Sequence, residues 1–84
     1  MDIRKLEIFC EVYRRRSYST AAKAVRLTQS AVSQQVKALE RELGVALFDR
    51  MSRQTPTAAG DYLYDEGARL IAQMRDVENG VRQA

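Results

Sequence analysis

Apolar residues near the start of the chain recur at the spacing of an α-helix, and they predict a helix over residues 3–15. Asp2 is suited to cap its N-terminus, because the positive end of a helix dipole favours a carboxylate. Cys10 falls within the apolar stripe, so we interpret it as a small buried side chain rather than a reactive thiol. The stripe consists of Leu6, Phe9, Cys10 and Tyr13.

A short second helix and a tight connection follow. Residues 17–19 interrupt the periodic pattern, and Ser19 is expected to cap a helix over residues 20–25. Residues 26–28 connect it to a third helix, which the pattern predicts over residues 29–43. Two short helices joined by about three residues form the helix-turn-helix arrangement.

The third predicted helix has two faces of different chemistry. Thr28 is suited to cap its start, and Gly44 is suited to end it. Successive residues turn by about 100°, so an apolar and a polar set fall on opposite sides. The inward set is Val32, Val36, Leu39 and Leu43. The outward set is Ser30, Ser33, Gln34, Lys37 and Arg41.

The outward face suits recognition of duplex DNA. Ser33 and Gln34 can donate and accept hydrogen bonds at base edges in a major groove, and a glutamine can pair bidentately with adenine. Lys37, further along, suits phosphate contacts that position the protein without reading sequence. An exposed polar face that binds no ligand is the alternative interpretation.

A small basic hairpin is predicted after the third helix. Residues 47–50 and 53–55 are expected to form its two strands, which end at Pro56 because proline has no N–H to donate. Arg50 and Arg53 lie near its turn, where they can contact phosphate or enter a minor groove. Arginines that serve only solubility are the alternative.

A long last helix is predicted from residue 58 to at least residue 79, with Thr57 as its cap. Six of its residues alternate at spacings of four and three, which is typical of a heptad seam between paired helices. Packing within the chain's own core is the alternative, especially near Leu63. The pairing can be parallel or antiparallel. The seam consists of Leu63, Gly67, Leu70, Met74, Val77 and Val81.

Length and composition narrow the class of protein. The 84 residues are 45% hydrophobic, which suits one small domain with a packed core. The longest apolar run is four residues, and no signal-peptide core opens the chain. A single cysteine allows no disulfide within one chain, and the absence of histidine removes the commonest general base and zinc ligand. We therefore expect a soluble cytoplasmic protein that is not an enzyme and has no metal or cofactor.

The charge is unevenly distributed along the chain. Residues 1–56 carry 11 basic and 6 acidic side chains, whereas residues 57–84 carry 3 and 5. The excess of basic residues in the N-terminal part is compatible with phosphate binding and also with an ordinary solvated surface. The charge distribution alone leaves this question open. Together with the helix-turn-helix and the heptad seam, it leads us to expect a DNA-binding unit over residues 1–56 and a dimerisation helix over residues 57–84.

The order of these motifs resembles the N-terminal winged helix-turn-helix and linker helix of LysR-type bacterial transcriptional regulators. The resemblance covers the whole chain, and its most specific part is the run with Leu39-Glu40 followed by residues 43–50. The motifs that carry it are residues 17–22, residues 28–35, Leu39-Glu40, residues 43–50 and residues 57–60.

The resemblance implies a mainly α fold, with three helices, a hairpin wing and a long C-terminal helix. It also implies which residues meet DNA. The expected base-reading residues are Gln29, Ser30, Ser33 and Gln34. The expected phosphate and wing contacts are Lys37, Arg50 and Arg53, with Ser19, Thr20 and Thr28 as additional phosphate contacts through helix N-termini.

Three positions depart from the pattern of that family. Arg16 stands where glycine is frequent, so the turn that follows the first helix is less permissive. Ser30 stands where proline is frequent. Gln34 stands where arginine is frequent, which argues against a guanine contact by this side chain.

The expected function is sequence-specific binding of an inverted repeat in double-stranded DNA, by a homodimer paired through the last helix, in transcription regulation. The effector-binding domain of full-length LysR-type regulators is absent, so we interpret the chain as an excised DNA-binding domain, with a naturally short relative as the alternative. The related alternative is the similar domain of molybdate-responsive regulators. The alternative from another class is a helical dimerisation or adaptor module that binds an acidic protein.

Overall fold

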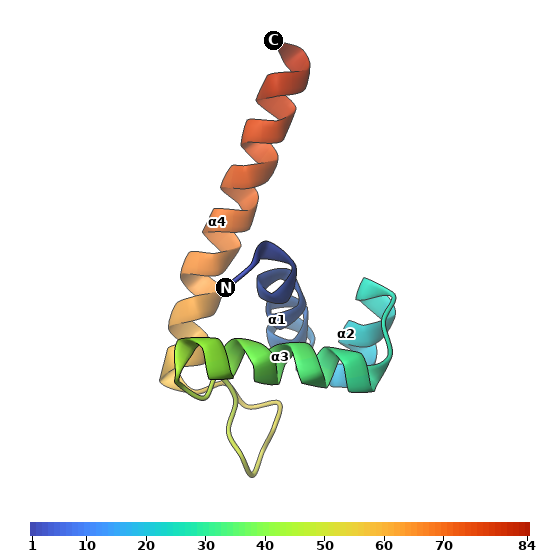
Figure 1. The fold of residues 1–84 in the computed structure, drawn as a ribbon, viewed down its shortest axis with the longest axis vertical. Helices are drawn as coiled ribbons and strands as arrows, with labels where there is room; N and C mark the ends of the chain where they lie inside the picture. The colour runs from blue at the N-terminus through green and yellow to red at the C-terminus, as the bar shows by residue number, and fades with distance from the viewer.

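Four helices account for most of the chain in a computed structural model that describes all residues 1–84. They are α1 (Ile3–Arg15), α2 (Tyr18–Val25), α3 (Gln29–Leu43) and α4 (Ala58–Gln83). The first three pack together, while α4 packs beside α1 and then continues away from the body (Figure 1). The molecule is consequently elongated, with extents of 48 × 25 × 20 Å.

Side-chain caps set the starts of the helices. Asp2 accepts a hydrogen bond from the Lys5 N–H at 2.8 Å, which confirms the cap predicted for α1. Thr28 and Thr57 cap α3 and α4 in the same way, as predicted. These hydroxyl and carboxylate oxygens satisfy backbone donors that have no partner within the first helical turn.

The start of α2 differs from the prediction. Ser17, not Ser19, is the cap: its backbone is extended at φ −155°, and its Oγ accepts from the Thr20 N–H at 3.1 Å. Tyr18 is therefore the first helical residue, and its side chain is buried at 8% exposure. Three polar or aromatic residues in a row concealed this boundary, because Ser17 and Ser19 are equally good caps by residue type.

Three helices end in the left-handed conformation. Gly44 adopts it at φ 73°, as expected of a C-terminal glycine, but Arg16 and Arg26 also adopt it, at φ 52° and 59°. Left-handed backbone costs a residue with a Cβ about 1 kcal/mol. Arg16 offsets this cost, because its Nε donates to the Tyr13 carbonyl at 2.7 Å and its guanidinium lies over the Tyr13 ring.

The core lies where α1 meets the other helices. Phe9 is fully buried and contacts Phe48, which enters from the loop after α3, with ring centroids 5.4 Å apart. Cys10 is also fully buried, which raises the pKa of its thiol to about 11 and confirms its prediction as a core residue. The inward prediction for Leu43 is wrong, because α3 extends beyond the core after Leu39 and leaves Leu43 41% exposed.

The wing is a loop closed by one β-bridge between Phe48 and Pro56, and the two predicted strands do not form. Asp49 Oδ1 accepts from the backbone N–H groups of Met51 and Ser52, which holds the tip in a turn. Thr55 N–H donates to the Ser52 carbonyl at 2.9 Å. Two backbone hydrogen bonds flank the bridge, from the Asp49 N–H to the Thr55 carbonyl at 2.8 Å and from the Thr57 N–H to the Leu47 carbonyl at 3.0 Å. Beyond them the tip is held by local bonds and the ladder does not continue.

The first half of α4 belongs to the same core as α1. Gly67 lies against Leu6 so closely that a Cβ there would be 2.7 Å from Leu6 Cδ1, and Ile71 is 8% exposed. Tyr64 stacks on Tyr13 with ring centroids 4.1 Å apart. The division between residues 1–56 and 57–84 stays a prediction, but α4 is firmly attached up to Ile71.

None of the four helices is both long and apolar enough to cross a membrane.

The ion pair between α1 and α3 is expected to make the fold sensitive to acid. Lys5 Nζ lies 2.7 Å from Glu42 Oε2, and this hydrogen bond holds the pKa of Glu42 below its ordinary value. A carboxyl whose folded pKa is lowered stabilises the fold above its unfolded pKa, and the contribution is lost as the pH falls through the folded pKa. The melting temperature should therefore fall between about pH 5 and pH 3.

Thermal melts of the wild-type chain and of Glu42→Gln at pH 7, 5 and 3 check this expectation. Glu42→Gln should melt lower at pH 7 and lose less on acidification. An equal acid-induced fall in both proteins would show that other carboxylates carry the effect.

Candidate nucleic-acid interface

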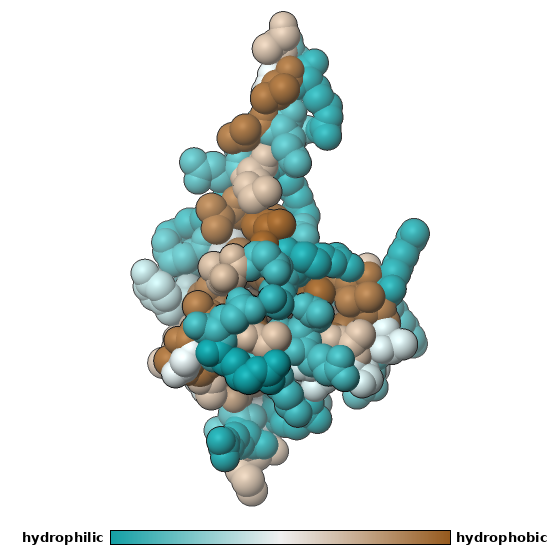
Figure 2. Space-filling model, in the orientation of Figure 1, coloured by the Kyte–Doolittle hydropathy of each residue, from teal (hydrophilic) through white to brown (hydrophobic).

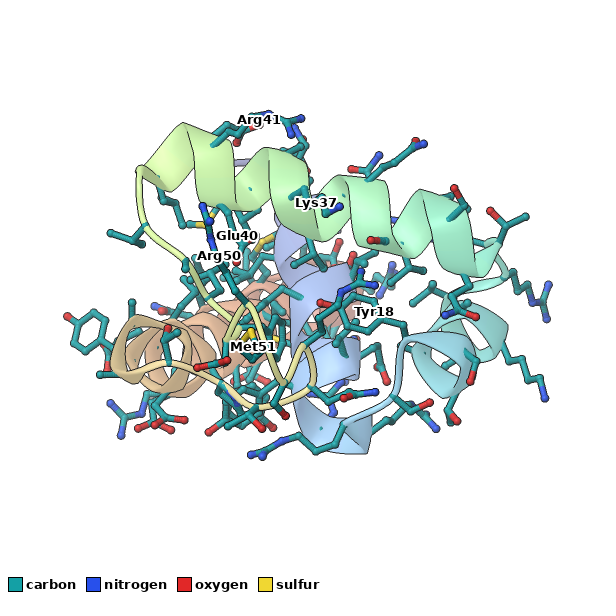
Figure 3. The ribbon with its side chains drawn as sticks, turned by 90° about the horizontal axis from the view of Figure 1, so that it is seen from below. Tyr18, Lys37, Glu40, Arg41, Arg50 and Met51 are labelled. Carbon is teal, nitrogen blue, oxygen red and sulfur yellow. The ribbon has the colours of Figure 1, made fainter.

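A groove of about 690 Å³ separates the outer side of α3 from the loop that follows it. Figure 3 looks onto this side: Lys37 and Arg41 lie along α3, whereas Arg50 lies on the loop. Tyr18 and Phe48 contribute aromatic surface to the lining. The cationic residues that line the groove are Lys37, Arg41, Arg50 and Arg53.

Both carboxylates that line the groove are bound to backbone N–H groups. Glu40 Oε2 accepts from Leu47 N–H at 2.7 Å and from Phe48 N–H at 3.3 Å, which ties the loop to α3. Asp49 accepts from two N–H groups of its own turn, and these bonds hold its pKa below the ordinary value. The carboxylates therefore shape the groove and are not free to pair with its cations.

The four groove cations make no ion pair, whereas half of the basic residues elsewhere in the chain do, namely Lys5, Arg14, Arg15, Arg69 and Arg75. Glu11, for example, pairs with both Arg14 and Arg15, which lowers the pKa of its carboxyl. Unpaired cations beside a groove leave a positive potential that favours an anionic ligand. The arrangement is therefore suited to phosphate.

The predicted reading residues lie on the first half of α3, before the part of the helix that lines the groove. Gln29, Ser30 and Gln34 are exposed and make no hydrogen bond through their side chains, so their donors and acceptors are available. Ser33 is partly buried, and its Oγ accepts from Arg53 Nη2 at 2.9 Å. The structure therefore brings together three free polar side chains and one that is already engaged.

The three hydroxyls predicted near phosphate are all exposed. Thr28 accepts from the Ala31 N–H at the start of α3, so its hydroxyl hydrogen remains free to donate. Ser19 and Thr20 lie on the first turn of α2 and both contact the hydroxyl of Ser17. These groups lie at helix N-termini, which favour anions.

The two wing arginines lie in different environments. Arg50 is exposed on the loop, and its neighbour Met51 is 94% exposed at the tip. Arg53 folds back instead, with its guanidinium 5.0 Å from the centroid of the Tyr18 ring. Sequence reasoning missed Tyr18 and Glu40 as residues that shape this site, because nothing in spacing alone indicates that a loop will return to them.

The predicted seam on α4 divides into an inner and an outer part. Leu63 is partly buried against the core, and Gly67 is buried against Leu6. The outer four residues begin beside the buried Ile71 and continue along the free half of the helix, where apolar side chains are visible along α4 (Figure 2). Their exposed fractions are 45% for Leu70, 40% for Met74, 60% for Val77 and 71% for Val81.

Helices α2 and α3 form a helix-turn-helix, and α3 carries an exposed polar face and unpaired cations. These features define the class of DNA-binding domains that read duplex DNA through the second helix of the motif. Residues 3–61 match the family described as "Bacterial regulatory helix-turn-helix protein, lysR family". The chain belongs to this lysR family. The resemblance inferred from the motifs is thereby confirmed, as is the mainly helical winged helix-turn-helix fold with its long C-terminal helix.

The curated relatives are described as transcriptional regulators. The HTH-type transcriptional regulator CfxR of Cupriavidus necator is 42% identical over 83 residues, which are 98% of this chain and 26% of CfxR. AbaB of Streptomyces antibioticus is 41% identical over 83 residues, which are 96% of this chain and 28% of AbaB. The chain thus spans about a quarter of the length of these relatives.

Solved structures with the same fold include complexes with DNA. The BenM_DBD/catB site 1 DNA complex superposes with a TM-score of 0.95 at 28% identity, over 99% of this chain and 90% of that one. The CbnR_DBD-DNA complex gives a TM-score of 0.90 at 30% identity, over 99% of this chain and 97% of that one.

Proposed function

We propose that this domain binds an inverted repeat in double-stranded DNA as a homodimer, with α3 in the major groove of each half-site. The observation that carries the proposal is the outer face of α3, where free polar side chains on the first half of the helix precede the unpaired cations that line the groove. The DNA complexes of similar domains support it. Such binding is the work of a bacterial transcription regulator in the cytoplasm.

The reading residues in this proposal are Gln29, Ser30, Ser33 and Gln34. Gln34 is exposed and unengaged, so its amide can present a donor and an acceptor together to an adenine edge. Lys37, Arg50 and the hydroxyls of Ser19, Thr20 and Thr28 hold phosphates on either side. The two groups have different signatures, because base contacts change sequence preference whereas phosphate contacts change overall affinity.

The homodimer in this proposal forms through the outer part of the α4 seam. Leu70, Met74, Val77 and Val81 face away from the chain's own core, and a second copy of the same stripe would cover them. Pairing gives two heads related by a two-fold axis, which matches an inverted repeat. In this proposal the two α4 helices pair antiparallel, because that arrangement separates the DNA-binding units of the two copies.

Replacement of Gln34 by Ala should relax the sequence preference, because the bidentate contact to one base is lost. Discrimination at that position should fall about 5- to 100-fold, which corresponds to about 1–3 kcal/mol. Lys37→Ala should instead weaken binding to all duplexes alike and lower the slope of log affinity against log salt concentration by about 1. Fluorescence anisotropy on a duplex selected from a random pool, and on its scrambled form, measures both effects.

Gln35→Ala is the matched control, since Gln35 is a neighbouring glutamine that is partly buried. It should leave the preference unchanged. If Gln34→Ala left the preference intact as well, the base-reading assignment would be wrong. Equal affinity of the wild-type domain for selected and scrambled duplexes would instead favour an adaptor that binds an acidic protein.

Regulation by the whole protein extends beyond these residues. Because the chain spans 26% of CfxR, we propose that it acts as the DNA-binding part of a longer regulator that carries an effector-binding domain.

A further inference from the structure

Arg53 of the wing lies against α2 and α3, unlike its neighbour Arg50. Its Nη2 donates to Ser33 Oγ at 2.9 Å, and its guanidinium carbon lies 5.0 Å from the centroid of the Tyr18 ring. The Tyr18 hydroxyl also donates to the Arg53 backbone carbonyl, at 3.4 Å. Tyr18 is buried and packs edge-on against Phe48, so the surface that holds the Arg53 side chain is fixed.

This contact competes with the base-reading role of Ser33. The hydroxyl oxygen of Ser33 accepts from a cation, so a base amino group that needs the same oxygen meets a positive charge beside it. Gln34 has no such neighbour, because its side chain is exposed and makes no hydrogen bond. Ser33 therefore offers its oxygen to DNA only after Arg53 has moved away.

DNA supplies stronger partners for the Arg53 guanidinium than Ser33 and Tyr18 do. A hydroxyl oxygen is a neutral acceptor, whereas a phosphate oxygen is anionic and forms a shorter and stronger bond with an arginine. The negative potential of a narrow minor groove attracts an arginine in the same way. Arg53 is exposed, so its side chain can leave Ser33 by rotation about its own single bonds.

We propose that Arg53 and Ser33 restrain each other in the unbound domain and exchange their mutual hydrogen bond for DNA contacts together. The inference rests on the proposed function, in which α3 reads the major groove while the wing contacts DNA outside it. Movement of Arg53 onto the DNA frees the Ser33 oxygen, so a site that engages the wing also gains the reading contact of Ser33. Arg53 thereby affects specificity at a base that it does not touch.

A double-mutant cycle on DNA affinity tests this coupling. In the wild-type domain, Ser33→Ala removes a base contact and also removes the bond that restrains Arg53, so the two effects oppose each other. In Arg53→Ala nothing restrains Ser33, and the same substitution loses the whole base contact. Ser33→Ala should therefore cost about three- to tenfold more affinity in the Arg53→Ala background than in the wild-type background, which is the usual contribution of one hydrogen bond.

Arg50→Ala supplies the matched background, because Arg50 is an exposed wing arginine that makes no contact with Ser33. Ser33→Ala should cost the same there as in the wild-type domain, and far-UV circular dichroism verifies that each variant is folded. An equal cost in all three backgrounds would overturn the proposal. A larger cost in the wild-type domain than in Arg53→Ala would also overturn it, because the two side chains would then stay bonded and cooperate on DNA.

Nuclear magnetic resonance follows the Arg53 side chain directly. The ring current of Tyr18 shifts protons over its face upfield, so the side-chain protons of Arg53 should resonate upfield of those of Arg50 in the domain alone. Addition of a duplex selected from a random pool should move the Arg53 protons towards the values of Arg50. Upfield shifts that persist in the complex would show that Arg53 stays on Tyr18, and the exchange would be overturned.

The outcomes separate this inference from the proposed function. If Gln34→Ala relaxes the sequence preference but the cycle shows no coupling, α3 reads DNA and Arg53 does not restrain Ser33. If neither Gln34→Ala nor Ser33→Ala changes preference or affinity in any background, reading by α3 fails and this inference fails with it.

Discussion

Leu70→Asp is expected to convert the proposed homodimer into monomers and to reduce affinity for an inverted repeat by about 100-fold. The side chain of Leu70 is 45% exposed, although its neighbour Ile71 is buried, so an aspartate is tolerated by the single chain. In a paired helix the same change places two carboxylates in an apolar seam, where their desolvation opposes association. Two linked heads gain a factor of about 10² or more over one head, and this factor is lost with the dimer.

Sedimentation equilibrium measures the dimer, and anisotropy with full and half-site duplexes measures the affinity. The monomeric variant should bind a half-site as well as the wild-type domain does. Asn79→Asp is the matched control, because it adds the same charge to the exposed surface of α4 on the side opposite Leu70. An unchanged dimer in Leu70→Asp would place the interface elsewhere on the molecule.

Gly60→Ala is expected to cause the largest loss of stability of any single methyl group added to this chain. A Cβ at Gly60 would lie 2.2 Å from the Leu47 carbonyl oxygen. That oxygen is backbone, and it accepts from the Thr57 N–H at 3.0 Å, so it cannot move without breaking the attachment of α4 to the wing. We expect a loss of about 2–3 kcal/mol, or roughly 10–20 °C in melting temperature for a domain of this size.

The other helical glycines supply a graded set of controls. Gly67→Ala meets the flexible end of Leu6 at 2.7 Å, so it should cost less than Gly60→Ala. Gly80→Ala meets nothing within 4 Å and should stabilise the chain by about 0.5–1 kcal/mol, because alanine loses less backbone entropy in a helix. Differential scanning calorimetry should rank the three in this order. Equal effects at Gly60 and Gly80 would show that the contact with Leu47 is not rigid.

The sequence predicted the helices well because their signals are local. The bounds of α1 and α3 agree with the structure, since each combines a capping side chain with an apolar stripe at helical spacing. The start of α2 was missed by two residues because Ser17 and Ser19 are chemically equivalent as caps. Capping preference alone cannot locate the start of a helix where two nearby residues are equally good caps.

The wing and the inner part of the α4 seam depended on contacts between distant residues. Asp49 binds the backbone N–H groups of Met51 and Ser52 and so sets the shape of the tip of the wing, and spacing carries no sign of this. Gly67 fits a heptad pattern as well as it fits the contact with Leu6, so periodicity alone could not assign its partner. The same limit explains why Arg53 was grouped with Arg50, although only Arg53 lies on Tyr18.

The contacts that fix the first half of α4 affect the spacing of half-sites that a dimer can bind. Between Gly60 and Ile71 the helix is fixed to α1 and the wing. The direction in which the free half of α4 leaves the body is therefore fixed as well. Each residue advances a helix by about 1.5 Å and rotates it by about 100°. The positions of the seam residues along α4, counted from the attached Gly67, therefore set both the separation and the relative rotation of the two DNA-binding units. The length of α4 thus determines which spacing of half-sites a dimer can bind.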